Sequence, residues 1–239
     1  SDFKPIAAPR VAFWTVFSGI HSVANQTDGK ILLGGEGPYG AWPAFAPPTE
    51  PLLRGVTRWL SSGDMDKTFL ATTNVGYRAG IQSMYGEGFS HVSVVQLTAE
   101  NMILVAGAFD IFNGQTKGPL VRLNSEGAID PTFQAKLEGS LAGLLLQSDG
   151  AVLVTGYLPK INGGMSLIRL LPNGNLDANF RTEITGTIAK TALQPDGKIL
   201  VAGAFTAISG IPVSGIARLQ LNGSLDTGFN SGAAPQFDW

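Results

Sequence analysis

The chain has 239 residues, of which 31 are glycine, 14 are proline, 44% are hydrophobic and 14% are charged. This composition favours a folded all-β protein, and a net charge of −2 without a run of lysine or arginine argues against a nucleic-acid partner. The absence of cysteine excludes disulfides and thiolate metal sites, and no apolar stretch approaches the roughly 20 residues of a membrane span.

Four segments of the chain align with one another, which indicates an internal repeat. Each first half is a turn, usually Asp-Gly, followed by a short aliphatic run: residues 26–35, 98–107, 147–156 and 194–203. Each second half starts at an arginine, followed five residues later by glycine, eight later by aspartate and eleven later by phenylalanine. The repeats cover about 16–69, 91–133, 140–180 and 187–229, with insertions at 37–53 and 71–90.

The spacing in each second half predicts a hairpin. We expect a three-residue loop, in which a type I turn is followed by a glycine in the left-handed conformation. The arginine and the aspartate then face each other across the hairpin, and an apolar pair lies beside them. The predicted ion pairs are Arg58–Asp66, Arg122–Asp130, Arg169–Asp177 and Arg218–Asp226. The predicted apolar pairs are Trp59–Met65, Leu123–Ile129, Leu170–Leu176 and Leu219–Leu225.

In chain order, each repeat has four predicted strands: one before the first turn, the aliphatic run after it, the Arg-Leu segment, and the Leu-Asp-x-x-Phe segment. Asn101 stands where the other first turns have glycine, and asparagine also tolerates the left-handed conformation. Four short strands in each 40–50 residues is the period of a propeller blade. The sequence therefore predicts an all-β fold, a β-propeller-like array of four blades of about four antiparallel strands each. We expect a single domain over residues 1–239, either a closed ring or a piece of a longer array.

The stretch from Leu193 to Phe229 resembles the delta-60 repeat family of bacterial β-propellers. Units of that family read roughly Gln-Pro-Asp-Gly-Lys-Ile-Leu-Val-Gly-Gly-x-Phe and then Ala-Arg-Leu-Asn-x-Asp-Gly-Ser-Leu-Asp-x-x-Phe. The resemblance covers about residues 16–230, and the chain departs from it at Gly34 to Arg54 and at Ala71 to Ser90. It implies an exported bacterial protein, extracellular, at the cell surface or periplasmic, and no catalytic residues to carry over.

The four Arg–Asp pairs are interpreted as structural, because a catalytic constellation would be expected once and these recur in every repeat. The alternative is calcium binding by turn carboxylates, for which Asp64, Asp66, Glu126 and Asp130 are the candidates. No repeat has the dense spacing of oxygen ligands that calcium loops show, so we expect no metal and no cofactor.

Two further patterns are weaker. Residues 35–40 match the dinucleotide motif G-x-G-x-x-G, but prolines at positions 43, 47 and 48 forbid the helix that such a site requires. The chain has two histidines, His21 and His91, both beside strand-like runs, and no partners for a zinc site or a catalytic triad can be identified. We expect a packed structural role for His21, which falls within the first strand of its repeat.

The first insertion carries three aromatic residues, Tyr39, Trp42 and Phe45, and five prolines. Long loops in compact domains are usually functional. This loop either packs over the fold or forms a contact surface for another protein or for a carbohydrate, since aromatic side chains bury much area at low entropic cost.

These observations favour a non-catalytic protein-interaction or scaffold module, whose partner is another protein subunit or a surface component. A carbohydrate-binding, lectin-like propeller is the alternative hypothesis, and a glycan would then be the partner. A propeller hydrolase or lyase is a third hypothesis, and it requires carboxylates or a metal to converge in a central channel.

Overall fold

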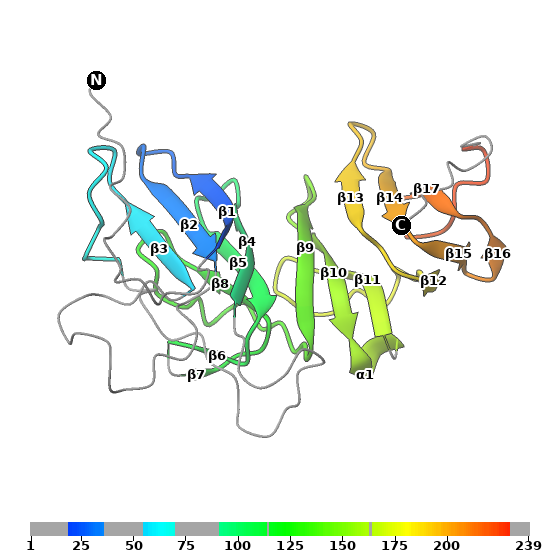
Figure 1. Ribbon diagram of the computed structural model, residues 1–239, viewed down its shortest axis with the longest axis horizontal. Coiled ribbons are helices and arrows are strands. Elements are labelled where there is room, and N and C mark those ends of the chain that lie inside the picture. The colour runs from blue at the N-terminus through cyan, green and yellow to red at the C-terminus, as the bar shows by residue number, and fades with distance from the viewer. Residues whose placement is uncertain (1–18, 36–54, 70–90, 114, 163, 230–239) are drawn as a thin grey trace. The chain divides into compact units, whose positions relative to one another are not determined.

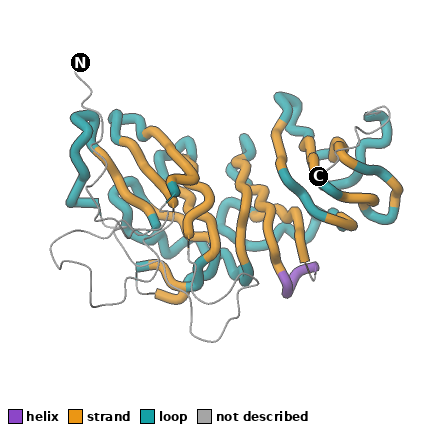
Figure 2. Tube along the Cα trace, viewed as in Figure 1, coloured by secondary structure: helices purple, strands orange, loops and turns teal. Residues whose placement is uncertain are grey.

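A computed structural model describes residues 19–35, 55–69, 91–113, 115–162 and 164–229 (Figure 1). This part of the chain is all-β apart from one helical turn, α1 (Pro159–Asn162), which links two strands of the third repeat (Figure 2). That helix is far too short to cross a membrane, and no other helix occurs in the described ranges. The chain divides into two compact units, Ser1–Pro131 and Thr132–Trp239, and each is described by itself.

The first unit contains the first two repeats. Its strands are β1 (Ile20–Asn25), β2 (Ile31–Gly35), β3 (Val56–Trp59), β4 (His91–Leu97), β5 (Ile103–Ala108), β6 (Ile111–Phe112), β7 (Gln115–Thr116) and β8 (Leu120–Leu123). The first repeat forms the antiparallel sheet β1-β2-β3, and the second forms β4-β5-β8. A small hairpin, β6-β7, fills the connection between β5 and β8.

The second unit contains the third and fourth repeats. Its strands are β9 (Ser140–Leu146), β10 (Val152–Leu158), β11 (Gly164–Leu170), β12 (Ile184–Gly186), β13 (Lys190–Leu193), β14 (Ile199–Gly203), β15 (Phe205–Ile208), β16 (Ile211–Pro212) and β17 (Gly215–Leu219). The third repeat forms the antiparallel sheet β9-β10-β11, and the fourth forms β13-β14-β17. A further sheet, β12-β15-β16, lies within the fourth repeat.

The first turn of each repeat has the expected geometry. In the first repeat, the N–H of Gln26 donates to the carbonyl of Lys30 at 2.8 Å, and Gly29 has a φ of 84°. Asn101 has a φ of 60° at the equivalent position, so it adopts the left-handed conformation that glycine adopts in the other three repeats. The prediction of tight first hairpins is confirmed.

The fourth strand expected in each repeat is reduced to a single bridge, which corrects the prediction of four strands per blade. Each repeat sheet has three strands, and the Leu-Asp-x-x-Phe segment adds one bridged residue to its outer edge. The physical reason is the aspartate. In the first repeat, Oδ1 of Asp66 accepts the backbone N–H of Thr68 at 2.9 Å, and this local turn diverts the chain from a strand. Asp177 and Asp226 form the same turn, with Asn179 and Gly228.

No sheet closes on itself within the described ranges. A ring of four blades and a single domain over the whole chain therefore remain predictions. The hairpin β6-β7, the helical turn α1 and the sheet β12-β15-β16 were not predicted from the sequence.

Each unit has a core made by two repeat sheets. Side chains alternate between the two sides of a strand, so each sheet has two faces. We call the face that packs on the following repeat the trailing face, and the face that packs on the preceding repeat the leading face. The first core combines trailing residues of the first repeat with leading residues of the second: Ala24, Leu32, Val56 and Phe69 with Val95, Leu97, Ile103, Val105, Val121, Leu123 and Ile129.

The second unit repeats this arrangement between the third and fourth repeats. Its trailing residues are Leu145, Leu153, Leu167 and Phe180, and its leading residues are Leu193, Ile199, Val201, Ala217, Leu219 and Leu225. Counted from the first turn and the arginine, these positions correspond to those of the first unit. One mode of sheet packing therefore builds both cores.

Candidate functional site

The structure brings together every arginine and aspartate that the sequence paired. The closest nitrogen–oxygen distances are 2.9 Å for Arg58–Asp66, 2.7 Å for Arg122–Asp130, 2.6 Å for Arg169–Asp177 and 2.8 Å for Arg218–Asp226. The four predicted apolar pairs are present as bridges: Trp59–Met65, Leu123–Ile129, Leu170–Leu176 and Leu219–Leu225. The loop glycines have φ values of 87–89° at Gly63, Gly127 and Gly174 and 86° at Gly223. The predicted loop therefore places each pair.

The first of these clusters is the most enclosed. The side chain of Arg58 is 1% exposed, its Nε donates to Asp66, and its guanidinium carbon lies 4.7 Å from the centre of the Phe69 ring. The second repeat completes the cluster, because Nη1 of Arg58 donates to the carbonyl of Ser125 at 2.5 Å and Nη2 to Glu126 at 2.9 Å. A charge buried this deeply is tolerated because it is paired and hydrogen-bonded.

The aspartates of these clusters are held in their charged form. The pKa of Asp66 lies below its ordinary value, chiefly because the Thr68 hydroxyl donates to it, with the Arg58 charge adding to the effect and burial opposing it. The pKa of Asp226 is lowered chiefly by Lys198, whose Nζ lies 3.0 Å away, and then by Arg218, against the opposing effect of burial. Lowered values are the opposite of what a general acid needs at neutral pH.

The pKa of Asp177 is also lowered, first by the backbone N–H of Asn179 and then by Arg169. Arg169 is held further by Gln147 and Asp149 of its own first turn. Each of these aspartates is thus occupied by donors of its own chain.

The calcium candidates are engaged in other contacts. Asp66 and Asp130 pair with their arginines, Glu126 pairs with Arg58, and Asp64 accepts a hydrogen bond from the Ser62 hydroxyl at 2.8 Å. Within the described ranges, no three histidine, cysteine, aspartate or glutamate side chains form a group that could hold a metal ion.

The two histidines lie together. His21 on β1 and His91 on β4 have ring centres 5.8 Å apart, with the ring planes inclined at 54°. They meet because β1 of the first sheet packs on β4 of the second. Sequence spacing alone could not bring together two residues 70 positions apart in the chain.

The three aromatic residues of the first insertion, Tyr39, Trp42 and Phe45, lie outside the described residues, as do the whole of 37–53 and 71–90. Their role as a contact surface stays a prediction.

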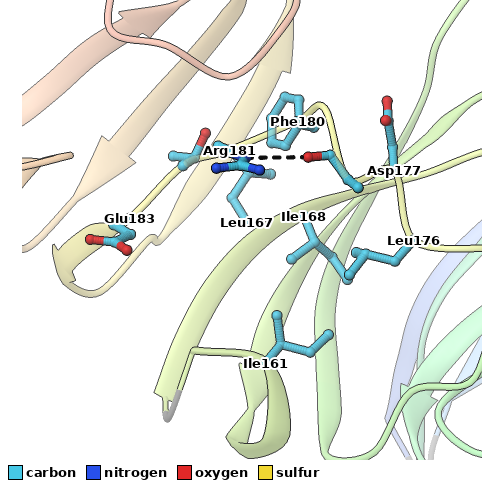
Figure 3. A pocket seen from close by; sticks show the side chains of 10 residues that line it. Ile161, Leu167, Ile168, Leu176, Asp177, Phe180, Arg181 and Glu183 are labelled. Atoms are coloured by element: carbon cyan, nitrogen blue, oxygen red, sulfur yellow. Dashed lines mark hydrogen bonds between the residues drawn. The ribbon is translucent and has the colours of Figure 1, made fainter.

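A shallow pocket that was not predicted lies beside β11, with about 310 Å³ of space (Figure 3). Its wall is mainly apolar and includes Ile161, Leu167, Leu176 and Phe180. Arg181 lies at this pocket and donates from Nε to the carbonyl of Ala178 at 3.4 Å, the bond drawn in Figure 3. Two carboxylates line the pocket: Asp177, which is paired with Arg169, and Glu183.

Within the described residues, the leading face of the first repeat is formed by Val23, Ile31, Leu33, Trp59 and Met65. These side chains project opposite to Ala24, Leu32 and Val56, which are in the core. Val23 is 61% exposed and the other four are partly exposed. Of the equivalent residues of the second repeat, Val95 is 4% exposed, Ile103, Val105 and Leu123 are each 0% exposed, and Ile129 is partly buried.

The fourth repeat, in the second unit, has a comparable apolar face. The trailing face of the fourth repeat consists of Ala192, Leu200, Ile216 and Phe229, of which Ala192 is exposed and the other three are partly exposed. Of their equivalents in the third repeat, Leu153 and Leu167 are 1% exposed, Phe180 is 8% exposed and Leu145 is partly buried. The signal for both faces was present in the sequence, because the first and fourth repeats have the same apolar alternation as the repeats beside them.

Comparison with known proteins finds a family model that matches three segments of the chain. Residues 101–133, 147–180 and 194–229 match a family model described as a domain of unknown function, DUF5122, of the β-propeller type. The matched ranges make up less than half of the chain and indicate repeats of the propeller type. The three matched ranges each run from a first turn to the phenylalanine that ends the repeat, so the family unit coincides with the unit read from the sequence. No curated protein matches the chain.

Several solved structures resemble this chain at low identity. A gluconolactonase from Xanthomonas campestris is 11% identical with a TM-score of 0.48, and the similarity covers 85% of this chain and 59% of that one. A GH74 xyloglucanase from the same organism is 14% identical with a TM-score of 0.49, over 85% of this chain and 30% of that one.

The extracellular domain of a one-component system from B. thetaiotaomicron is 15% identical with a TM-score of 0.43, over 89% of this chain and 23% of that one. The chain thus spans less than two thirds of each of these proteins. Because a fold hosts many functions, their activities do not carry over to it.

Proposed function

We propose that this chain is a non-catalytic protein-interaction or scaffold module of an exported bacterial surface protein or extracellular assembly, built from propeller repeats of the delta-60 type. The exported location rests on the resemblance of the repeats to that family. The interaction role rests on the geometry of the repeat faces.

The observation that carries the proposal is the leading face of the first repeat. An apolar sheet face of this kind is buried where a neighbouring repeat covers it, and here Val23 is 61% exposed. Contiguous exposed apolar surface marks sites of protein–protein contact. Burying it against a partner removes apolar area from water, which is the main favourable term in association.

The non-catalytic part of the proposal is supported by the state of the recurring polar groups. The carboxylates of Asp66, Asp177 and Asp226 are each bound by an arginine and by a local turn, and their pKa values are lowered. Groups locked in this way stabilise hairpins and are poorly suited to proton transfer at neutral pH.

The test is a binding comparison. The chain, a Val23→Glu variant and an Ile211→Glu variant are immobilised and exposed to surface proteins of the bacterium that encodes it. A retained protein is then purified and titrated by calorimetry. Ile211 is a matched control, because it is an apolar residue on β16, is 44% exposed, and belongs neither to the leading face of the first repeat nor to the trailing face of the fourth.

We expect binding at least about tenfold weaker for Val23→Glu, because a buried unpaired charge is costly at an interface, and unchanged binding for Ile211→Glu. A partner that binds all three chains equally, or the absence of any partner for the face, contradicts the proposal.

A further inference from the structure

The outer edge of β11, in the third repeat, lies where a fourth strand of the sheet would run. β11 pairs with β10 over all seven of its residues, but on its other side Leu170 alone is bridged, to Leu176, within the described ranges. The chain then turns at Asp177 and leaves the sheet. The edge of a strand carries N–H and C=O groups that can pair with another chain.

The register of the sheet shows which backbone groups of β11 face this edge. The carbonyl of Arg169 accepts the N–H of Asp177 at 2.9 Å, so the backbone groups of Arg169 point away from β10. In an antiparallel pair this direction alternates along the strand, so the N–H and C=O of Leu167 point the same way. Within the described ranges neither group of Leu167 has a hydrogen-bond partner, although this residue is only 1% exposed. Since buried backbone groups are nearly always paired, these two are set up to bind a donor and an acceptor of a ligand.

The pocket beside β11 lies on this side of the strand (Figure 3). Its lining includes Leu167 of β11 and also Leu176, which bridges to the same edge. Ile161 of α1 adds to the apolar wall, and Leu176 is 49% exposed. The volume of about 310 Å³ lies at the lower end of the range for ligand sites, about 300–1,000 Å³. A pocket of this size suits a short chain end better than a long segment.

Two charged side chains reach the pocket from one anchored segment. Burial alternates along it: Thr182 is buried and its hydroxyl donates to the fourth repeat at 2.6 Å, whereas Arg181 and Glu183 are exposed and line the pocket. The N–H of Arg181 donates to the carbonyl of Asn222 at 3.2 Å, and the carbonyl of Glu183 accepts the N–H of Ser209 at 2.7 Å. The backbone of both charged residues is therefore held in place by the fourth repeat.

Arg181 is the better anchor for a ligand. Its Nε donates to the carbonyl of Ala178 at 3.4 Å, and within the described ranges its two Nη groups have no partner. A guanidinium with such groups free binds a carboxylate through two parallel hydrogen bonds. In the same part of the chain, no contact fixes the side chain of Glu183, and Asp177 is already bound to Arg169. The charged group that this pocket can hold in a fixed geometry is therefore a carboxylate.

We propose that this pocket binds the C-terminal end of another polypeptide as a short fourth strand on β11. The free carboxylate of that end pairs with Arg181, its last backbone amides pair with the N–H and C=O of Leu167, and an apolar side chain packs on Ile161 and Leu176. Strand addition takes its affinity from main-chain hydrogen bonds and its specificity from the side-chain and carboxylate contacts. The site belongs to the second unit and makes no use of the leading face of the first repeat, so it is a second interaction surface.

The experiment titrates the purified chain with acetylated tripeptides that end in valine, leucine or phenylalanine, each made as the free acid and as the C-terminal amide. Calorimetry measures the affinities, and NMR of the isotope-labelled chain follows the amide signal of Leu167. Arg181→Gln removes the anchor. Lys136→Gln is the matched control, because it removes the same charge from an exposed residue that does not line the pocket. Circular dichroism checks that each variant keeps the fold.

We expect at least one free acid to bind at least about tenfold more tightly than its amide, because the amide cannot form the charged pair. Arg181→Gln should abolish this preference, and Lys136→Gln should keep it. Glu183→Gln should strengthen the binding of the acid by about twofold, since it removes a like charge from the pocket. The amide signal of Leu167 should shift as the peptide is added.

Free acids that bind no more tightly than their amides, or a preference that survives in Arg181→Gln, would overturn the inference. A Leu167 signal that does not move on binding would do the same. Tighter binding of acetyl-leucine than of the tripeptides would assign the pocket to a small molecule and not to a chain end. None of these results would touch the proposed function, which rests on the first unit and has its own test at Val23.

Discussion

Arg58 in the first repeat and Arg218 in the fourth make the same local contacts in different surroundings. Each pairs with an aspartate eight residues later, at 2.9 and 2.8 Å, and each lies over a phenylalanine ring at 4.7 Å. Arg58 is sealed by the turn of the second repeat, whereas Arg218 is 23% exposed. The hairpin alone therefore forms the ion pair, and the neighbouring repeat decides how far solvent reaches it.

The two aspartates also differ in their second donor. In the first repeat, the hydroxyl of Thr68 donates to Asp66 at 2.6 Å. The fourth repeat has Gly228 at this position and no hydroxyl, and Lys198 reaches the carboxylate instead. Lys30, the equivalent lysine of the first repeat, pairs with Asp28 of its own turn. The additional donor to the carboxylate is therefore the hydroxyl of Thr68 in the first repeat and Lys198, which directly precedes β14, in the fourth.

The largest expected effect comes from removing the two arginines in parallel. Arg58→Ala leaves Asp66 buried without its cation and should lower the free energy of unfolding by about 3–5 kcal/mol. Arg218→Ala should cost several-fold less, because solvent reaches that cluster. Urea denaturation followed by circular dichroism measures both, and equal losses would show that the neighbouring repeat contributes nothing.

The next effect tests how the fourth repeat is joined to the third. Gly223 has a φ of 86°, and a Cβ there would lie 2.4 Å from the hydroxyl of Thr182. Gly223→Ala should destabilise by about 2–3 kcal/mol, combining left-handed strain with loss of the Thr182 hydrogen bond. Gly210 is the control, since it has a φ of 76° and open space around it, so Gly210→Ala should cost about 1–2 kcal/mol from strain alone. Equal losses of stability in the two variants, measured by thermal unfolding, would contradict a role for the contact between Gly223 and Thr182.

A smaller effect isolates the hydrogen bond of that junction. The buried hydroxyl of Thr182 donates to the carbonyl of Gly223 at 2.6 Å. Thr182→Val keeps the shape and should cost about 1 kcal/mol. Thr206→Val is matched to it, because Thr206 makes an exposed and longer bond of 3.4 Å to Thr185, and its loss should be barely measurable. Equal shifts of the denaturant midpoint in the two variants would show that the Thr182 hydrogen bond contributes no more to stability than the exposed one of Thr206.

The smallest expected effect is on the acid dependence of stability, and it is tested at Lys198 and Lys30. A carboxyl whose folded pKa lies below its unfolded value of about 3.9 adds stability that is complete above that pH and is lost as the pH falls through the folded pKa. Lys198→Met removes the main cause of the lowered pKa of Asp226, so this pKa should rise and the acid-dependent loss of stability should begin at a higher pH. The difference from wild type should vanish below the pKa values of both proteins.

The matched variant is Lys30→Met, which acts in the same way on Asp28 in the first unit. NMR titration of the two carboxyl groups, with thermal unfolding from pH 7 to pH 2, measures each shift. An Asp226 pKa that does not move in Lys198→Met would mean that Arg218 and the turn alone set it.

Much of the local structure could be predicted because it depends on residues close in the chain. The interval from arginine to glycine to aspartate specifies one loop, and that loop places Arg122 opposite Asp130 and Leu123 opposite Ile129 without help from the rest of the fold. The left-handed Asn101 follows from the same local chemistry. The fourth strand was wrong because the aspartate side chain binds the backbone two residues later, and this competes with strand pairing.

The sequence by itself determined the repeat, its hairpins, its ion pairs and the apolar alternation of its strands, since each depends on spacings of a few residues. Tertiary structure decided which face of each sheet meets which neighbour, why Arg58 is sealed and Arg218 is not, and how His21 comes to lie beside His91. Those features depend on packing between repeats, and the energy of that packing comes from surface that only a folded neighbour can cover.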